Sequence, residues 1–266
     1  MNILVLIKYS LDVAEIKVDA ATHELRLAGV PEKIGNIDKN VVEAAVRLKE
    51  AAGGTVQALC LGPLAAREAF KDVLAMGVDE VTLIEDPFGG QADAAVIVSV
   101  LQAAIAKRGS FDVIVCGFAS DDGYTYQVGP RLAERLHLPL VSYTRSISVA
   151  DGTLKADRDL EDRLQTVSVA LPALISIAEE AFPPRRTTLM DAIKAKKKPV
   201  NVWHIDAELG LDRAALEAGS CVAAVSQTGV VIQRKQNVLK GQSMAAMADQ
   251  LIDALQHENV VSGGAA

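Results

Sequence analysis

Aromatic residues and cysteines are scarce in this chain of 266 residues, and both shortages limit what it can be. Only 4% of the residues are aromatic although 50% are hydrophobic, so the core must be built from Val, Ile, Leu and Ala. Such aliphatic strands are typical of parallel sheets buried between helices. The three cysteines, Cys60, Cys116 and Cys221, have no CxxC spacing, and two of them sit in apolar runs. We expect buried thiols in a reducing compartment.

An excess of positive charge and a membrane-spanning run are also missing. The net charge of -7 and the pI of 5.2 argue against general nucleic-acid binding. The first apolar run, Ile3 to Ile7, is too short for a membrane span and lacks a basic n-region and a cleavage site. We expect a cytoplasmic protein with no nucleic-acid partner and no membrane insertion.

The familiar catalytic signatures are absent from the sequence. The four histidines follow no metal-ligand spacing, so no metal site is expected. Neither a GxSxG elbow nor a GxxxxGK[ST] phosphate loop occurs. The paired acids Glu179-Glu180 and Asp121-Asp122 are of a kind more often solvated or capping than catalytic. Binding is therefore a better prediction than catalysis by this chain alone.

Strand and helix patterns alternate through the first half of the chain. Apolar β-type runs at 3–7, 55–61, 80–84 and 113–116 are each followed by a helical pattern. The expected helices start at an N-cap, Asp38, at the Gly62-Pro63 turn, near Ala92, and between Tyr124 and Gln127. This alternation predicts an α/β fold, a Rossmann-like doubly wound and mostly parallel sheet of the adenine-nucleotide α-hydrolase-like type.

The alternation breaks after a strand at 138–141. Three short strand-like pieces at 145–149, 154–160 and 164–169 predict antiparallel additions at the sheet edge, before a last core strand at 171–177. Beyond Phe182, Thr188 should cap a short helix, and the tail has one strand-like run, Val230 to Ile232, and an amphipathic helix near 243–255. We predict a nucleotide-binding α/β domain over 1–182 and a partner-docking loop with a C-terminal arm over 183–266.

The stretch from Phe111 to Pro130 is the candidate ligand site. A strand, a Gly-bearing loop and a helix N-terminus form a phosphate cradle in α/β proteins, because free N–H groups and the positive dipole end face one point. The loop has no lysine to polarise a phosphate, so we predict nucleotide binding and not phosphoryl transfer. At this level the stretch could also be a plain connection. The groups suited to a phosphate or ribose are Asp121, Asp122, Thr125, Gln127 and three glycines, Gly117, Gly123 and Gly129.

A basic segment, Lys194 to Lys198, stands out in this acidic chain. Charge runs are commonly solvated faces. Its position beside the polar loop 184–189 also suits docking of an acidic partner surface.

Several of these motifs together resemble the β subunit of electron transfer flavoprotein. They occur in consistent order over about residues 1–212. The matching motifs are Asp38-Lys39-Asn40 with 45–50, the run 75–80, Asp122-Gly123-x-Thr125-x-Gln127-Val128-Gly129-Pro130, Leu171-Pro172-Ala173, and Pro184-Arg185-x-x-Thr188-Leu189 with 192–198.

The resemblance implies a heterodimer with an α subunit that carries flavin adenine dinucleotide (FAD). The complex would shuttle electrons between a dehydrogenase of the acyl-CoA type, or a related oxidoreductase, and other redox partners. The β subunit's own nucleotide is AMP in the housekeeping branch and a second FAD in the flavin-bifurcating branch, where NADH supplies a hydride. The cofactor-binding positions carried over are Leu6, Gly35, Asn36, Ile37, Asp38, Leu61, Ala119, Ser120, Asp121, Asp122, Gly123, Tyr124, Thr125, Tyr126, Gln127, Val128, Gly129 and Pro130.

The partner-docking positions implied by the resemblance lie in the loop after Phe182. Leu189 takes the place of the family's anchoring leucine, as a small exposed hot spot would. The full set is Pro184, Arg185, Leu189, Lys194, Lys196 and Lys197.

The sequence departs from the family pattern at three places. Gly35-Asn36 replaces the common Asn-Pro, 119–122 differs from the frequent Gln-Ala-Ile-Asp, and Arg186 replaces an aromatic residue. The Asp-Gly-x-Thr-x-Gln-Val-Gly-Pro form resembles the bifurcating and Fix-type branches, which favours FAD over AMP in the β site. A nucleotide-sensing protein on the same scaffold is the rival interpretation.

Overall fold

The computed structural model describes residues 1–88, 92–222, 224, 226–231 and 235–261. The chain divides into two compact units. The larger comprises residues 1–17 and 25–227, and the smaller comprises residues 18–24 and 228–266. Each unit is described by itself below.

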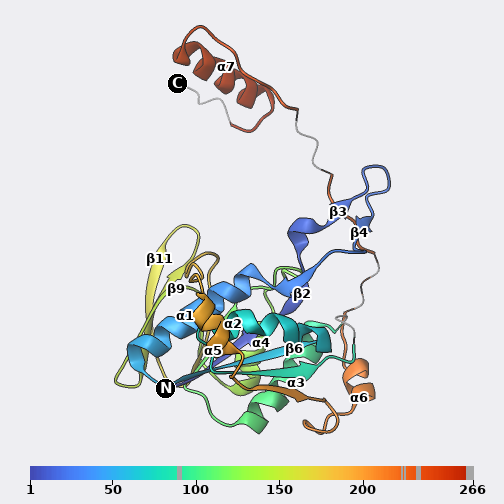
Figure 1. The fold of residues 1–266 in the computed structure, drawn as a ribbon. Helices are drawn as coiled ribbons and strands as arrows, with labels where there is room; N and C mark the ends of the chain where they lie inside the picture. The colour runs from blue at the N-terminus through green and yellow to red at the C-terminus, as the bar shows by residue number, and fades with distance from the viewer. Residues whose placement is uncertain (89–91, 223, 225, 232–234, 262–266) are drawn as a thin grey trace. The chain divides into compact units, whose positions relative to one another are not determined.

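A nine-stranded sheet forms the centre of the larger unit (Figure 1). Its strand order is β11-β10-β9-β12-β8-β1-β6-β7-β13. The seven neighbouring strands β9, β12, β8, β1, β6, β7 and β13 pair in parallel. Strands β10 and β11 add antiparallel pairs at the β9 edge. The strands are β1 Asn2–Ile7, β6 Thr55–Gly62, β7 Glu80–Glu85, β8 Val113–Gly117, β9 Leu140–Ala150, β10 Thr153–Asp159, β11 Leu164–Ala170, β12 Ala173–Ile177 and β13 Val200–Trp203.

Helices cover both faces of this sheet. Ile3, Val5 and Ile7 of β1 pack in the same core cluster as the helices of one face, while Leu4 and Leu6 pack with those of the other. Both side-chain rows of β1 are thus buried, which explains its unbroken apolar sequence. One face carries α1 Asn36–Ala52, α2 Phe70–Met76 and α5 Leu189–Ala195, and the other carries α3 Ala94–Arg108, α4 Val128–Leu136 and α6 Arg213–Ala218. The predicted doubly wound, mostly parallel α/β fold is confirmed.

Short elements complete the described chain. Strand β2 (Tyr9–Leu11) pairs antiparallel with β5 (Glu32–Ile34). The 3-10 helices are η1 Val13–Glu15 and η2 Leu64–Ala69, and two further short strands are β3 Lys17–Val18 and β4 Leu25–Arg26. In the smaller unit, α7 (Met244–His257) is capped by Ser243, whose Oγ accepts from the Ala246 N–H at 3.2 Å. No helix among the described residues is long and apolar enough to cross a membrane.

Several element boundaries differ from the predicted ones. Asp38 is not the N-cap of α1, because the helix begins at Asn36 with Gly35 in that place. Helix α4 begins at Val128, since Tyr124 and Tyr126 have φ of 46° and 61°, which no right-handed helix allows.

The second half of the sheet also corrects the sequence analysis. The expected strands at 138–141 and 145–149 are one strand, β9, interrupted by a bulge. Strand β13 and helix α6 were not predicted. At the strand-like run 230–232, Val230 and Val231 form no strand, and Ile232 lies outside the described residues.

A buried acid on α1 ties this helix to the loop after β12. Glu43, with a side chain only 2% exposed, accepts from Arg185 Nε at 2.8 Å and from Arg47 Nε at 2.6 Å. Arg185 also pairs with Glu50 at 2.6 Å. One turn earlier, Asn40 accepts from the Phe182 N–H at 2.6 Å and donates to the Ala178 carbonyl. The loop that leads to α5 is therefore fixed by the polar side of α1.

We predict that Glu43→Gln lowers the free energy of unfolding by about 2 kcal/mol, because two arginines lose their buried carboxylate. Burial raises the pKa of Glu43, but Arg185 and Arg47 outweigh it and hold that pKa below its usual value of 4.5. The difference from wild type should therefore be full above about pH 4.5 and shrink as the pH falls below it. Urea unfolding at pH 7 and pH 4 measures both effects.

Glu50→Gln is the matched control for this prediction. It removes a carboxylate from the same arginine, but its side chain is 54% exposed, so the change should stay within about 0.5 kcal/mol. Equal losses in the two variants would contradict the role given to burial.

Candidate functional site

The chain reverses its direction of winding between β1 and β8. From β1 it proceeds outward through β6 and β7, and then α3 carries it across to β8 on the other side. Ligands of open α/β sheets bind at the carboxyl ends of the strands at such a switch point. The predicted cofactor residues after Gly117, and those at the start of α1, both lie at this edge.

The start of α1 and the end of β8 approach each other closely. A Cβ on Gly117 would lie 2.6 Å from Ile37 Cγ2, so no other residue fits without displacement. A Cβ on Gly129 would likewise lie 2.9 Å from Cys116 Sγ. The absence of a side chain at Gly129 therefore allows the first turn of α4 to pack against β8. Leu6 and Leu61, near the ends of β1 and β6, belong to the core cluster beneath this edge.

A lysine from outside the loop reaches the acidic residues of the site. Lys8 follows β1 directly, and its Nζ lies 2.7 Å and 2.8 Å from the two carboxylate oxygens of Asp122. Burial acts to raise the pKa of Asp122, but its hydrogen bond and ion pair with Lys8 outweigh this and lower that pKa. Lys8 was not predicted as a site residue, because it lies outside the loop 117–130, which itself contains no lysine. The position of Lys8 at the end of the first core strand was the available signal.

Asp121 occupies a different part of the same edge. Its Oδ2 accepts from the Asn36 N–H, the first backbone donor of α1, at 2.6 Å. This contact is consistent with the interpretation of Asp121-Asp122 as solvated or capping residues.

Asp38 is a buried carboxyl with an unused oxygen. It is 5% exposed, and its Oδ1 accepts from the Lys8 N–H at 2.9 Å, whereas its Oδ2 has no hydrogen-bond partner among the described residues. Burial raises its pKa to about 8, and the charges of Asp121 and Asp122 add to this, against the Lys8 N–H. A Cβ on Gly35 would lie 2.9 Å from this Oδ2 and closer still to Asp121. A buried polar atom without a partner suits a ligand that donates a hydrogen bond. We call Asp38, together with Gly35, Lys8 and Asp121 around it, the Asp38 site.

The loop from 118 to 127 folds back through Ser120. The Ser120 carbonyl accepts from the Tyr124 N–H at 3.1 Å, and its Oγ accepts from the Gly123 N–H at 3.3 Å. Beyond Thr125, the N-cap of α4 is Gln127, whose side chain makes no capping hydrogen bond in the described structure. The first N–H groups of α4 thus remain available to an anion.

These groups fit an adenine nucleotide. The Asp38 oxygen can accept from a hydroxyl or amino group, and the uncapped start of α4 suits a phosphate. Glycines at 35, 117 and 129 let neighbouring parts of the chain pack closely around these groups, because a Cβ at each would lie within 3 Å of Asp121, Ile37 or Cys116. Ala119, Asn36, Val128 and Pro130 belong to the same two segments and supply main chain.

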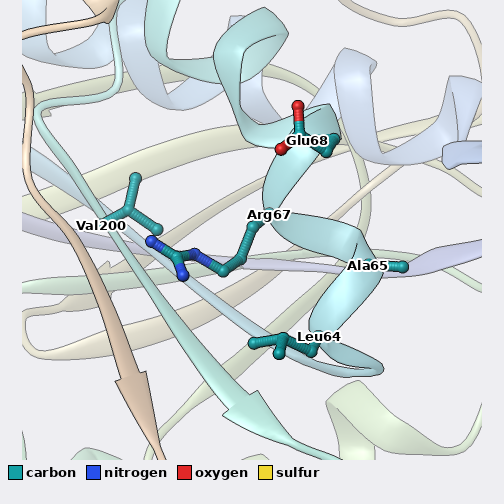
Figure 2. Close-up of a pocket in the computed structure, with 5 residues that line it drawn as sticks. All are labelled: Leu64, Ala65, Arg67, Glu68 and Val200. Carbon is teal, nitrogen blue, oxygen red and sulfur yellow. The ribbon is translucent and has the colours of Figure 1, made fainter.

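An open pocket of about 520 Å³ lies elsewhere on the larger unit, and none of the predicted site residues line it. Figure 2 shows Arg67 extending from η2 toward Val200 of β13. The lining residues are Leu64, Ala65, Arg67, Glu68 and Val200. A second groove between α3 and α4 includes one predicted residue, Pro130.

The predicted docking segment begins with a capped helix. Thr188 and Asp191 form the capping box of α5, so the predicted cap is confirmed. Leu189 is 78% exposed and follows the cap directly, with Met190 and Ile193 also exposed beside it. Lys194, Lys196 and Lys197 are exposed, as is Pro184, while Arg185 is held by the acids of α1.

The last lysine of the basic run has a structural role. Lys198 Nζ donates to the carbonyls of Leu74 and Val78, at the end of α2 and just beyond it.

Comparison with known proteins agrees with this fold. A family model described as the electron transfer flavoprotein domain matches residues 25–208. The chain is 34% identical to an electron transfer flavoprotein subunit beta of Thermoanaerobacterium thermosaccharolyticum, over 98% of this chain and 100% of that protein. It is 31% identical to the subunit of the same name of Clostridium acetobutylicum, with the same coverage. Over the same shares it is 30% identical to the caffeyl-CoA reductase-Etf complex subunit CarD of Acetobacterium woodii. The chain belongs to the electron transfer flavoprotein family, among its β subunits.

Proposed function

We propose that this chain pairs with an FAD-carrying α subunit and holds a second FAD at the switch point between β1 and β8. The heterodimer then passes electrons between an acyl-CoA-type dehydrogenase, or a related oxidoreductase, and other redox partners in the cytoplasm. The bound flavin supplies the redox chemistry, including acceptance of a hydride from NADH if electrons are bifurcated. AMP in the same site, with a purely structural role, is the alternative.

The observation that carries the proposal is the unpartnered buried oxygen of Asp38, at the switch point where the uncapped start of α4 also lies. Similarity to a subunit of a caffeyl-CoA reductase-Etf complex supports a branch in which the β subunit works within a reductase complex.

In the proposed complex, the protein groups bind and orient the nucleotide. Asp38 accepts a hydrogen bond from the ligand, and Lys8 balances the charge of the adjacent aspartates. The exposed apolar side chains at the start of α5 contact the dehydrogenase, and the lysines beside them attract its acidic surface.

The cofactor content tests the proposal directly. The purified heterodimer should release two FAD molecules per αβ pair on denaturation, measured by absorbance and chromatography of the released nucleotides. One FAD with one AMP would establish the alternative. A colourless chain holding only ATP would contradict both and favour the nucleotide-sensing interpretation.

We predict that nucleotide binding depends on pH through Asp38. A ligand donor prefers the ionised carboxylate, so binding releases a proton at every pH below the free-state pKa of about 8. The Kd for FAD should therefore fall about tenfold between pH 6 and 7 and about fivefold between pH 7 and 8. Titration calorimetry of the nucleotide-free heterodimer, in buffers of different ionisation enthalpy, measures both the slope and the proton release.

Asp38→Asn should remove this slope and weaken binding about tenfold at pH 8, because an amide nitrogen cannot accept the ligand's hydrogen bond. Asp122→Asn is the control. Since the pKa of Asp122 is lowered, that residue is ionised over the whole range and is not the source of the slope. Its charge adds to the raised pKa of Asp38, so its loss should move the slope to lower pH without removing it. An unchanged slope in Asp38→Asn would assign the proton to another group.

We predict that Leu189→Ala slows electron transfer to the dehydrogenase about tenfold and leaves the cofactor content unchanged, because Leu189 is exposed and distant in sequence from the cradle. Stopped-flow reduction with the dehydrogenase gives the rate. Leu164→Ala is the control. It makes the same change at an exposed leucine of β11, outside the docking segment, and should have no effect. Loss of flavin in Leu189→Ala would rule out a docking role.

A further inference from the structure

Aromatic side chains gather at one place in a chain that has few of them. Three of the four tyrosines, Tyr124, Tyr126 and Tyr143, surround Phe118 with ring centroids 5.6 Å, 5.6 Å and 6.2 Å from its ring. The rings of Tyr124 and Tyr126 meet edge to face at 5.2 Å. We call these four residues the aromatic cluster. Within the cluster, Phe118 is buried, while each of the three tyrosines is exposed by 37–43%.

The backbone of each tyrosine in the cluster adopts an unfavourable conformation. Their φ angles are 46°, 61° and 55°, in the left-handed region that bulky residues rarely occupy. Such residues cost free energy, and they persist where the surrounding structure imposes them, most often at functional sites. Core packing alone does not require three strained residues that remain more than a third exposed.

The structure holds Tyr143 in its strained conformation through a bulge in β9. Ser142 and Tyr143 together stand opposite the single residue Ser176 of β12, and Ser176 Oγ accepts from the Tyr143 N–H at 3.3 Å. Arg158 of β10 stabilises the bulge by donating to the carbonyl of Ser142 at 3.0 Å and to the Oγ of Ser142 at 2.8 Å. Bulges commonly re-aim one side chain beside a functional site. Here the bulge brings Tyr143 to the cluster.

The cluster lies at the carboxyl edge of the sheet, on a loop that also contributes to the Asp38 site. Phe118 is the first residue after β8, and its N–H donates to the Ile177 carbonyl at the end of β12. Tyr124 and Tyr126 share one loop with Asp122, which binds the Lys8 whose N–H donates to Asp38. A ligand held beside Asp38 would therefore have the cluster on a loop that already forms part of its site.

The charges nearby indicate which part of a ligand suits this place. Burial and the charge of Glu179 raise the pKa of Tyr124, with further contributions from Tyr126 and Asp121. Two carboxylates beside the phenols disfavour a phosphate. A flat uncharged ring gains from stacking and edge contacts with tyrosines, and its polar rim can bond to their hydroxyl groups.

We propose that the aromatic cluster is a second-ring subsite, on which the isoalloxazine ring of a dinucleotide packs when its adenosine part lies beside Asp38. This inference rests on the proposed function and makes it more specific. A mononucleotide such as AMP has no second ring to reach the cluster. The cluster is therefore a determinant of selectivity for FAD over AMP.

The test compares FAD and AMP binding by nucleotide-free heterodimers that carry Tyr124→Leu, Tyr126→Leu or Tyr143→Leu, singly and combined. Each single change should weaken FAD about 3- to 10-fold, the triple change by more than 30-fold, and AMP by less than twofold. The corresponding phenylalanine variants keep the rings and should bind FAD within about threefold of wild type. Because a nearby phenol quenches an excited flavin, the β-site flavin should fluoresce more strongly in the leucine variants than in wild type.

The outcomes separate this inference from the proposed function. If wild type binds AMP and no FAD in the β site, both the second flavin and the subsite are wrong. If FAD binds equally to wild type and to leucine variants with unchanged melting temperatures, the subsite alone is wrong. Equal weakening of FAD and AMP, or loss of α-subunit binding, would also overturn it and assign the cluster a structural or partner-docking role.

Discussion

The buried carboxyl of Asp38 is the constraint on which the rest of the site depends. It sits in the first turn of α1 beneath the edge of the sheet, and only half of its hydrogen-bonding capacity is used. Leaving an acceptor buried without a donor is costly unless a proton or a ligand satisfies it. Gly35, Lys8 and Asp121 surround it in an arrangement that no bulkier residue at position 35 would permit. In the proposed complex, the bound nucleotide supplies this donor.

Helix α1 connects the Asp38 site to the segment proposed to dock the dehydrogenase. From Asp38 its polar side continues through Asn40 to Glu43, and these two residues hold the backbone of Phe182 and the guanidinium of Arg185. All three side chains are buried, and all three face structure outside the helix. One helix thus positions both Asp38 and the loop that leads to Leu189. In the proposed complex, this helix therefore sets the spacing between the nucleotide and the docking surface.

The sequence allowed the order of strands and helices in the first half to be predicted, because each buried strand was an unbroken apolar run and each helix had a start or stop signal. It did not reveal which side chains meet. Lys8 and Asp122 are separated by 114 positions, and their ion pair follows from the adjacency of β1 and β8. Likewise, the bulge at Tyr143 depends on Arg158 and Ser176, so local patterns suggested two strands instead of one. Strand β13 was missed because four residues at a sheet edge carry little periodicity.

Asp121 gives the site a polarity. Its carboxylate already rests on the first backbone donor of α1, so a negative charge belonging to the protein fills the anion position of that helix. The start of α4 has no such occupant from the Gln127 side chain. In the proposed complex, a nucleotide can therefore enter in one orientation only, with its phosphates toward α4 and its hydroxyl-bearing part toward α1. Of the two helices that begin beside the switch point, α4 is therefore the one proposed to bind the phosphates.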